Sequence, residues 1–442
     1  MSENNDLTFL DDLGLGFAID RLGPATRPTP MRVSCLTSDD ERILYHSDPT
    51  VVRRLIDEGR ELPSFERAGP RERLFFDPRG LRAGIVTCGG LCPGINDVIR
   101  AIVLSLHFHY GVEAIDGFRY GYEGLIPGPD HEPVALTPAR VEMISDFGGT
   151  VLGTSRGDQD ISRMVDTLVT RGVSILFTIG GDGTLRGAAA IAAEIARRHL
   201  PIAVVGVPKT IDNDIAFIER SFGFVTATAE ARRVIEGAHS EALATRNGIG
   251  LVKLMGRESG FIAAHSSLAD SRVNFCLVPE VPFVLEGLLA ALRDRLAERG
   301  HAVIVVAEGA GQELVGRSNA RDASGNVKLG DIGLFLREAI NATFKELGPP
   351  VNLKYIDPSY TIRSLPANTY DSAYGLLLGY NAVHAAMSGR TNMVVGYWNN
   401  EYTHVPIPLA VHRRKTIDPQ GWLWNNVLLA TGQRLASPAQ RA

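Results

Sequence analysis

Two polar runs, each placed directly after an apolar segment, contain the residue types that phosphoryl transfer requires. The first run is Gly180-Gly181-Asp182-Gly183-Thr184. Glycines let backbone amides approach phosphate oxygens, and a helix that starts here adds a partial positive charge at its N-terminus. Asp182 then offers a carboxylate to Mg²⁺, which binds carboxylate and phosphate oxygens. The same residues also suit a plain turn between a strand and a helix.

The second run, Pro208-Lys209-Thr210-Ile211-Asp212-Asn213-Asp214, contains a candidate carboxylate pair. In an extended segment Asp212 and Asp214 point to the same side, because side chains alternate along a strand. Two like charges on one face are unfavourable unless a cation or a reacting proton uses them. We therefore predict that the pair activates a hydroxyl, with an Asx-type turn and solvated acids as the alternative.

Three further segments have glycines or cations where strands are expected to end: Gly89–Asn96, Gly148–Gly157 and Leu254–Phe261. The first two are interpreted as phosphate-facing loops or as plain turns. In the third, Arg257 is suited to clamp an anion or to offset charge in a transition state. Alternatively, Arg257 forms a surface ion pair with Glu258.

Lys354 and the run Tyr360-Thr361-Ile362-Arg363 place two cations and a hydroxyl close together in an acidic chain. This combination suits the capture of a substrate phosphate. Taken one at a time, each of these side chains is equally typical of a solvated surface charge.

Short apolar strands alternate with helices from Arg82 onward. The predicted strands are 84–87, 174–179, 202–205, 250–255, 275–278, 302–307, 355–356 and 393–397, and the predicted helices are 95–108, 188–198, 227–242, 259–267, 285–299, 332–347 and 372–388. The alternation is typical of parallel sheets covered on both faces. About eight such units exceed one doubly wound sheet, which favours two α/β domains with ligands bound beyond the carboxyl ends of the strands.

Composition excludes several classes of function. The 442 residues include 45 Lys plus Arg and 50 Asp plus Glu, so the net charge of −5 offers no general attraction for nucleic acid or an anionic membrane. The N-terminus lacks the basic start and apolar core of a signal peptide, and no apolar run is long enough to span a bilayer. None of the 11 histidines pair at metal-ligand spacing. We expect a soluble, cytoplasmic protein.

From Gly84 to about Leu409 these motifs occur in an order that resembles 6-phosphofructokinase, in particular the long-chain type of plants and trypanosomatid protists. The resemblance implies two Rossmann-like three-layer αβα domains with the active site in the cleft between them. It assigns residues 81–215 plus 389–421 to a nucleotide-binding domain and 216–388 plus 422–442 to a fructose-6-phosphate-binding domain. Residues 1–80, which have scattered prolines, form an N-terminal extension.

The resemblance also implies roles for individual residues. Those expected around ATP are Gly89, Arg156, Gly181, Asp182, Gly183 and Thr184, with Asp182 near Mg²⁺. Asp212 would be the base, supported by Asp214, while Thr210 contacts the sugar's 1-hydroxyl and Arg257 stabilises the transferring phosphoryl group. The remaining sugar-site residues are Ile211, Met255, Gly256 and Glu308, with Lys354, Tyr360 and Arg363 at the 6-phosphate. Short-chain bacterial enzymes have Arg and His at the Lys354 and Tyr360 positions.

Two positions bear on the phosphoryl donor. In pyrophosphate users of this family the Gly183 position is typically Asp, whereas Gly leaves room for a nucleotide. Lys209 is shared with pyrophosphate users, but plant and protist ATP enzymes combine this Gly with this Lys. We therefore expect Mg-ATP and fructose 6-phosphate as substrates, with a pyrophosphate-dependent enzyme as the alternative.

Two other classes of protein remain as alternatives. NAD kinases and diacylglycerol kinases have a similar Gly-Gly-Asp-Gly run, but they offer no account of Asp212, Arg257 and Arg363 together. A non-catalytic regulatory subunit that binds sugar phosphate would be marked by loss of the base, and both Asp212 and Asp182 are present. The family resemblance further implies a homotetramer and allosteric control.

Overall fold

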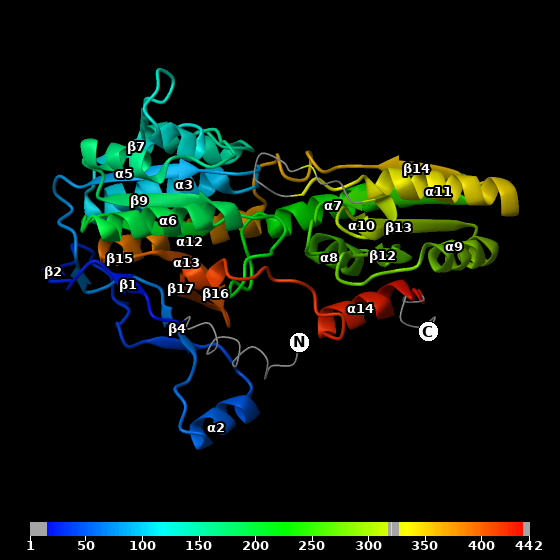
Figure 1. The fold of residues 1–442 in the computed structure, drawn as a ribbon, viewed down its shortest axis with the longest axis horizontal. Coiled ribbons are helices and arrows are strands. Elements are labelled where there is room, and N and C mark those ends of the chain that lie inside the picture. Colours follow the sequence, from blue (N-terminus) through cyan, green and yellow to red (C-terminus); the bar gives the residue numbers. More distant parts are fainter. Residues whose placement is uncertain (1–15, 317–319, 321–326, 436–442) are drawn as a thin grey trace. The chain divides into compact units, whose positions relative to one another are not determined.

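The computed structural model describes residues 16–316, 320 and 327–435, and the chain forms two compact units (Figure 1). Unit 1 comprises Met1–Thr210, Ile215–Gly223 and Ser364–Arg413. Unit 2 comprises Ile211–Asp214, Phe224–Arg363 and Arg414–Ala442. The chain therefore passes between the units several times, and each unit is built from segments that are distant in sequence.

Unit 1 contains a sheet of nine strands, parallel in its centre and antiparallel at both edges. In spatial order the strands are β3 (Arg42–Leu44), β4 (Ser64–Arg67), β17 (Glu401–Pro406), β16 (Met393–Trp398), β10 (Ala203–Pro208), β9 (Ile175–Gly180), β6 (Arg82–Thr87), β7 (Ala114–Gly117) and β8 (Val134–Ala135). The five strands from β16 to β7 are parallel. Every residue of β9 and β10 is buried, as expected for strands covered on both faces.

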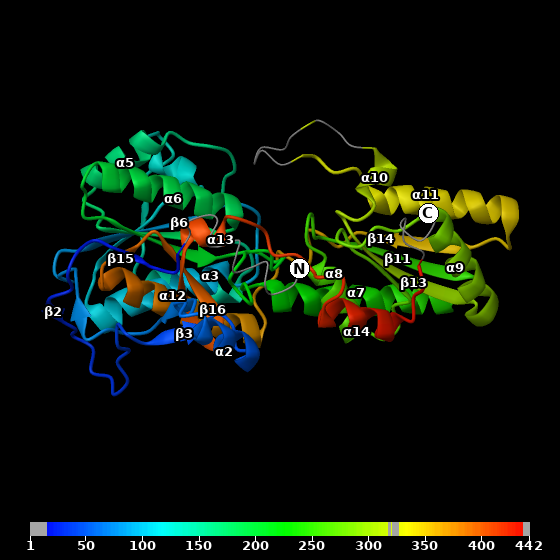
Figure 2. The same cartoon turned by 60° about the horizontal axis from the view of Figure 1, so that its bottom comes forward.

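Helices cover both faces of this sheet (Figure 2). One face is covered by α3 (Ile95–Leu104) and α12 (Thr369–Met387), and the other by α5 (Ile161–Thr170), α6 (Asp182–Arg197) and α13 (Ile407–Ala410). This arrangement confirms the predicted three-layer α/β class. Shorter elements of unit 1 are α2 (Pro49–Asp57), α4 (Pro138–Val141), the 3₁₀ turns Gly121–Leu125 and Ile144–Asp146, and the strand pairs β1 (Asp20–Arg21) with β15 (Arg390–Thr391) and β2 (Arg27–Pro28) with β5 (Arg73–Leu74).

Unit 2 contains a four-stranded parallel sheet in the order β12 (Phe275–Leu277), β13 (His301–Ala307), β11 (Gly248–Leu254) and β14 (Asn352–Ile356). Helices α9 (Leu285–Arg299) and α11 (Ile332–Leu347) share one apolar core with the sheet. Helices α7 (Phe224–Leu243), α8 (Phe261–Ala269) and α14 (Trp422–Thr431) form the opposite layer, and α10 (Gln312–Val315) is a single turn. A Cβ at Gly250 would lie 2.8 Å from the carbonyl oxygen of Ala238, so glycine here lets α7 approach β11 closely.

The predicted alternation of strands and helices from Gly84 to Tyr397 is confirmed, with shifts of at most three residues at most ends, but the helix predicted over 188–198 begins at Asp182, six residues earlier. One predicted helix, 95–108, is instead an α-helix to Leu104 followed by a π-helical turn over Ser105–His109. Sequence analysis missed the strands β7, β8 and β17 and the helices α5 and α14. Among the residues that the structure describes, no helix has the length and apolar character needed to cross a membrane.

The contacts divide the chain at other points than the predicted domain boundaries. Helix α12, predicted in the second domain, belongs to unit 1 because it packs on α3 and on β10. Gly379 allows this packing, since a Cβ there would lie 2.6 Å from the Cβ of Ala101. Asp212 and Asp214, predicted in the first domain, belong to unit 2. The ends of the predicted extension and second domain, 1–15 and 436–442, lie outside the described residues.

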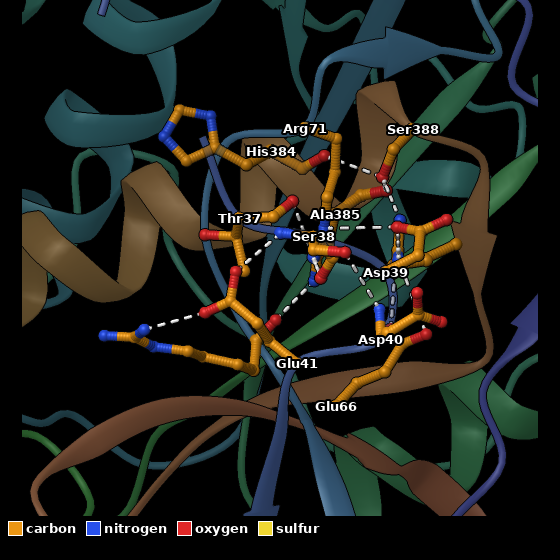
Figure 3. Close-up of polar contacts among 12 residues, drawn as sticks. Thr37, Ser38, Asp39, Asp40, Glu41, Glu66, Arg71, His384, Ala385 and Ser388 are labelled. Atoms are coloured by element: carbon orange, nitrogen blue, oxygen red, sulfur yellow. Dashed lines mark hydrogen bonds and ion pairs between the residues drawn. The ribbon is translucent and has the colours of Figure 1, made fainter. Parts of the chain in front are cut away.

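Ion pairs hold the predicted N-terminal extension to the rest of unit 1, and Figure 3 shows polar contacts around its residues Asp39, Glu66 and Arg71. Glu66 of β4 is 2% exposed and accepts hydrogen bonds from Arg21 Nη2 and Arg390 Nε, both at 2.6 Å. His404 Nδ1 donates a third at 3.0 Å, and Arg390 Nη2 donates to Asp39 at 2.8 Å. Burial raises the pKa of Glu66, but the hydrogen bonds from His404 and Arg390 outweigh it and hold this pKa far below its usual range. The extension is therefore an integral part of unit 1.

Replacing Arg390 with methionine is expected to lower the free energy of unfolding by about 3 kcal/mol, because removing one partner leaves buried charge uncompensated. Arg390 is 1% exposed, so water cannot take its place without local opening. Urea unfolding followed by circular dichroism measures the change. Arg79→Met is the matched control, since the Arg79 side chain is 91% exposed beside Asp77. A loss of less than about 1 kcal/mol for Arg390→Met, the value typical of a surface pair, would contradict this account.

Candidate active site

The first site cluster lies at the carboxyl ends of three adjacent parallel strands of unit 1, β6, β9 and β10. The backbone N–H of Lys209 donates to the Gly180 carbonyl at 2.9 Å, which joins the turn after β9 to the end of β10. The Gly89 N–H donates to the Ser155 carbonyl at 3.2 Å, and Thr154 Oγ1 donates to the Gly89 carbonyl at 2.6 Å. The structure therefore brings together the glycine-rich segments that sequence analysis predicted to face phosphate.

The turn from β9 into α6 has the geometry of a phosphate cradle. Gly181 is the N-cap of α6, so the first backbone amides of this helix point out of its N-terminus. A Cβ on Gly180 would overlap the side chain of Thr184, which makes glycine necessary there. A Cβ on Gly183 would meet nothing within 4 Å, so the position has open space in front of it. Gly183, the position predicted to select the phosphoryl donor, therefore has room for a Cβ.

Lys209 lies beside this turn, and Arg156 follows the Thr154–Ser155 segment that contacts Gly89, but the two cations differ in burial. Lys209 is 5% exposed, and its ammonium group donates a hydrogen bond to the carbonyl of Gly90. A Cβ added to Gly89 would lie 3.3 Å from Lys209 Nζ. Lys209 thus stabilises the Gly89–Gly90 turn through this hydrogen bond, whereas Arg156 is exposed in the neighbouring loop.

A pocket of about 510 Å³ adjoins these loops and was missed by sequence analysis. Its lining includes Arg119, Tyr120, Glu123 and Thr154, and Thr154 is also the residue that hydrogen-bonds Gly89. Tyr120 has a left-handed backbone with φ of 59°, and its carbonyl accepts a hydrogen bond from Ser155 at 2.6 Å. The only sequence signal for this pocket is that Arg119 and Tyr120 follow shortly after β7.

The second site cluster is a group of acids and arginines in unit 2. Burial, followed by the charges of Asp214 and Glu308, raises the pKa of Asp212 to about 8, while Arg414 and Arg257 act in the opposite direction. A buried carboxyl group with a raised pKa and two nearby arginines is a candidate general base. The structure thus brings together Asp212, Asp214, Arg257 and Glu308, as predicted.

The path of the chain through the carboxylate pair differs from the prediction. We expected an extended segment, but Ile211 and Asp212 form a bend and Asn213 has a left-handed backbone with φ of 55°. The Asp214 carbonyl accepts a hydrogen bond from the Lys415 N–H at 2.8 Å, and Arg414 Nη1 lies 3.9 Å from Asp214 Oδ2. The two carboxylates interact through this bend, which the 414–415 segment supports.

Arg414 and Lys415 are the functional candidates that sequence analysis missed in unit 2. Arg414 also lies 3.5 Å from Glu258, the residue considered as a partner for Arg257. The Lys415 carbonyl accepts a hydrogen bond from Ser259 Oγ at 2.6 Å. The only signal in the sequence was the basic run Arg413-Arg414-Lys415, whose distance from residue 212 along the chain hid the connection.

The ends of β11 and β13 position the residues that sequence analysis predicted for the sugar site. The Glu308 N–H donates to the Leu254 carbonyl at 2.9 Å, and the Gly309 N–H donates to the Gly256 carbonyl at 3.0 Å. Gly256 has φ of 124°, and a Cβ on Gly309 would overlap the carbonyl of Arg257. Met255, Gly256 and Arg257 are thereby held beside Glu308. Burial raises the pKa of Glu308, while the charges of Arg257 and Lys253 lower it.

The three residues expected at the 6-phosphate are only partly brought together. Tyr360 and Arg363 lie in the loop after β14, where the Arg363 guanidinium carbon is 4.9 Å from the centre of the Tyr360 ring. Tyr360 is 76% exposed. Lys354, however, lies inside β14 opposite Gly250, about 7 Å before the carboxyl end of its strand. It is exposed and stands apart from the loop.

Thr210 and Ile211 are consecutive residues at the change from unit 1 to unit 2. The Thr210 carbonyl accepts a hydrogen bond from Ser221 Oγ at 2.7 Å. Ile211 is 5% exposed, so its contribution to the site is its backbone and the bend that it starts.

The residues at the predicted metal position fit Mg²⁺ only together with a phosphate ligand. Within the described part of the chain, no three His, Cys, Asp or Glu side chains are grouped so that they could hold a metal ion. Asp182 offers one carboxylate in the first turn of α6, and its oxygens accept hydrogen bonds from Arg186 at 3.1 and 3.2 Å. Mg²⁺ is often bound by one or two carboxylates plus substrate phosphates, and Asp182 fits that mode.

Comparisons with known proteins agree with this architecture. Residues 82–386 match the family model described as phosphofructokinase. The ATP-dependent 6-phosphofructokinase of Borreliella burgdorferi is 46% identical over 437 residues, which cover 96% of this chain and 98% of that protein. The ATP-dependent 6-phosphofructokinase of Trypanosoma cruzi is 47% identical over 365 residues, 82% of this chain and 75% of that one.

Among solved structures, the pyrophosphate-dependent phosphofructokinase of Marinobacter aquaeolei superimposes with a TM-score of 0.67 at 18% identity, covering 81% of this chain and 93% of that one. At this identity the likeness concerns the fold alone.

Proposed function

Because the chain belongs to the phosphofructokinase family, we propose that it phosphorylates the 1-hydroxyl of D-fructose 6-phosphate with Mg-ATP, giving fructose 1,6-bisphosphate and ADP. The observation that carries the proposal is the environment of Asp212. Its pKa is raised to about 8 by burial and by Asp214 and Glu308, and two arginines face the same group. The relatives that match over most of the chain are named as ATP-dependent enzymes, which favours this function over the alternatives.

In the proposed mechanism Asp212 accepts the proton of the 1-hydroxyl as the hydroxyl oxygen bonds to the γ-phosphorus. The bond from that phosphorus to the oxygen bridging it to the β-phosphate breaks, and ADP leaves with that oxygen. Only the ionised carboxylate can accept the proton, and Asp214 favours proton uptake because a second negative charge lies nearby. Arg257 offsets the negative charge on the transferring phosphoryl group. In phosphoryl transfer the protein contributes mainly alignment and electrostatic stabilisation, and this group of residues supplies both.

We further propose that unit 1 holds the nucleotide and unit 2 the sugar phosphate. The amides at the start of α6 would bind donor phosphates, and the pocket lined by Arg119 and Tyr120 would hold the nucleoside. Asp182 would ligate Mg²⁺, which would offset negative charge on the donor phosphates. Met255, Gly256 and Glu308 would contact the sugar, and Tyr360 and Arg363 its 6-phosphate.

Two alternatives make different predictions. A pyrophosphate-dependent enzyme would share the Lys209 position, but the open space at Gly183 favours a nucleotide donor. A regulatory subunit would not need the base and its charged neighbours. From the family we also expect a homotetramer with allosteric control in the cytoplasm, and analytical ultracentrifugation tests the subunit number.

The test is product identification. Purified protein is incubated with Mg²⁺, ATP and fructose 6-phosphate, and ³¹P NMR assigns the position of the new phosphate. The proposal predicts ADP and fructose 1,6-bisphosphate in equal amounts. Binding of fructose 6-phosphate without turnover would instead support the regulatory subunit.

Replacing Asp214 with asparagine is expected to shift the acid limb of the kcat/KM profile for fructose 6-phosphate to lower pH. Removing the negative charge of Asp214 stabilises ionised Asp212, so the pKa of Asp212 falls and its carboxylate is deprotonated at lower pH. The profile from pH 5.5 to 9 measures the shift. Asp294→Asn is the control, because the Asp294 side chain lies on the exposed face of α9. An unchanged limb, or one moved to higher pH, contradicts the assignment.

A further inference from the structure

Lys253 is a buried cation in unit 2 to which the proposed mechanism gives no role. It lies near the carboxyl end of β11 and is 9% exposed. Its Nζ atom is 2.8 Å from Asp357 Oδ2 and 3.0 Å from Asp331 Oδ2. Burial lowers the pKa of Lys253, but the hydrogen bonds with Asp357 and Asp331 outweigh burial and hold it above its usual value. Lys253 is therefore charged and shared between two carboxylates.

Each carboxylate belongs to a different element beside β11 (Figure 2). Asp331 is the N-cap of α11, since its Oδ1 accepts a hydrogen bond from the Leu334 N–H at 3.0 Å. Asp357 begins the loop after β14 and accepts hydrogen bonds from the Ser359 N–H at 3.1 Å and from Ser359 Oγ. Lys253 thus ties β11 both to α11 and to the loop after β14.

That loop carries two of the residues proposed to bind the 6-phosphate. The turn organised by Asp357 continues to Tyr360 and Arg363, and the Thr361 N–H donates to the Pro358 carbonyl at 2.9 Å. The position of Asp357 consequently determines where the loop starts and how its arginine is presented.

Lys253 also faces the sugar-site acid Glu308. In the β11–β13 ladder Lys253 is opposite Val306, and Glu308 follows in the turn directly after β13. The charge of Lys253 lowers the pKa of Glu308, whereas Asp357 raises it. Without Lys253, three carboxylates would remain where a dianionic sugar phosphate is proposed to bind.

We propose that Lys253 is a positioning residue for the sugar phosphate. It neutralises Asp331 and Asp357 and holds the loop after β14, so that Arg363 can act on the 6-phosphate. The proposal rests on the proposed function. Lys253 would reduce the negative charge at this end of the sheet, so that the dianionic sugar phosphate can bind there.

The test compares Lys253→Met with Lys253→Arg in steady-state assays. For Lys253→Met we expect the KM for fructose 6-phosphate to rise about tenfold or more, because residues in one charge network are energetically coupled. The kcat and the KM for ATP should stay within about threefold, since neither depends on this loop. Lys253→Arg keeps the charge and should recover most of the loss. Lys345→Met, on the exposed end of α11, is the matched control.

A double variant separates charge from packing. In Lys253→Met/Asp357→Asn one of the two acids left without Lys253 is removed, the one that begins the loop after β14, so the KM for fructose 6-phosphate should fall part of the way back toward the parent value. If the double variant is no better than Lys253→Met, or if both substrates lose affinity equally, the proposal is overturned. Thermal unfolding shows whether a loss comes from stability alone.

Failure of the proposed function gives a different result. A parent chain that binds fructose 6-phosphate without turnover contradicts the proposed function, and the same comparison is then made with dissociation constants from calorimetry. A parent chain that does not bind fructose 6-phosphate overturns both proposals.

Discussion

Replacing Asp212 with asparagine is expected to lower kcat about a thousandfold, within the range typical of a lost general base. Asparagine has nearly the same shape but cannot accept the proton of the 1-hydroxyl. The change also removes a buried carboxyl group whose pKa is already raised toward 8 by Asp214 and Glu308, so the fold should tolerate it well. A coupled assay of ADP release gives kcat, and thermal unfolding checks the fold.

The affinity for both substrates separates this effect from misfolding. The KM values of Asp212→Asn should stay within about threefold of the parent values, because a group that acts only in the transition state changes kcat alone. Asp294→Asn, an amide exchange on an exposed helix face, should leave kcat unchanged. An Asp212→Asn enzyme that keeps its phosphorylation rate would show that another group is the base.

Replacing Gly183 with aspartate is expected to lower kcat/KM for ATP about a hundredfold or more. A second negative charge beside Asp182 repels the donor phosphates, and two unit charges 4 Å apart interact by about 4 kcal/mol near a protein surface. The new side chain meets no protein atom within 4 Å of its Cβ, so the effect is electrostatic rather than a steric clash. Steady-state kinetics with ATP and with pyrophosphate measure it.

Stability should not fall in this variant, because an acidic residue in the first turn of a helix is favourable. Gly237→Asp is a matched control: this glycine also lies in a helix, α7, is exposed, and leaves open space for a Cβ. We expect the ratio of pyrophosphate to ATP activity to rise for Gly183→Asp and to stay constant for Gly237→Asp. If Gly183→Asp uses ATP as well as the parent does, Gly183 does not select the donor.

Local periodicity was sufficient to predict most of the architecture. A strand before the glycine-rich turn and a helix after it were predicted from neighbouring residues, although the helix begins at Asp182 and not at 188. The ends of parallel strands meet at one edge of a sheet, which is why the predicted residues around Gly89, Gly181 and Lys209 are close together.

Features that depend on distant contacts could not be predicted in the same way. Asn213 adopts a left-handed backbone in a bend, and the segment that follows it is held by Arg414 and Lys415, two hundred positions later. Lys354 was placed with Arg363 on sequence proximity, but the strand register puts it inside β14. Arg390 and Glu66 are 324 residues apart, and no local pattern indicates that they pair.

The measurement that tests the account most directly is a steady-state comparison of ATP with pyrophosphate as donors to fructose 6-phosphate in the unaltered protein with Mg²⁺. Asp212 as a general base implies that the protein is catalytically active, and the open space at Gly183 favours the nucleotide as donor. We predict that kcat/KM is higher with ATP and that ADP and fructose 1,6-bisphosphate are formed together. Faster turnover with pyrophosphate, or no turnover with either donor, would contradict the account.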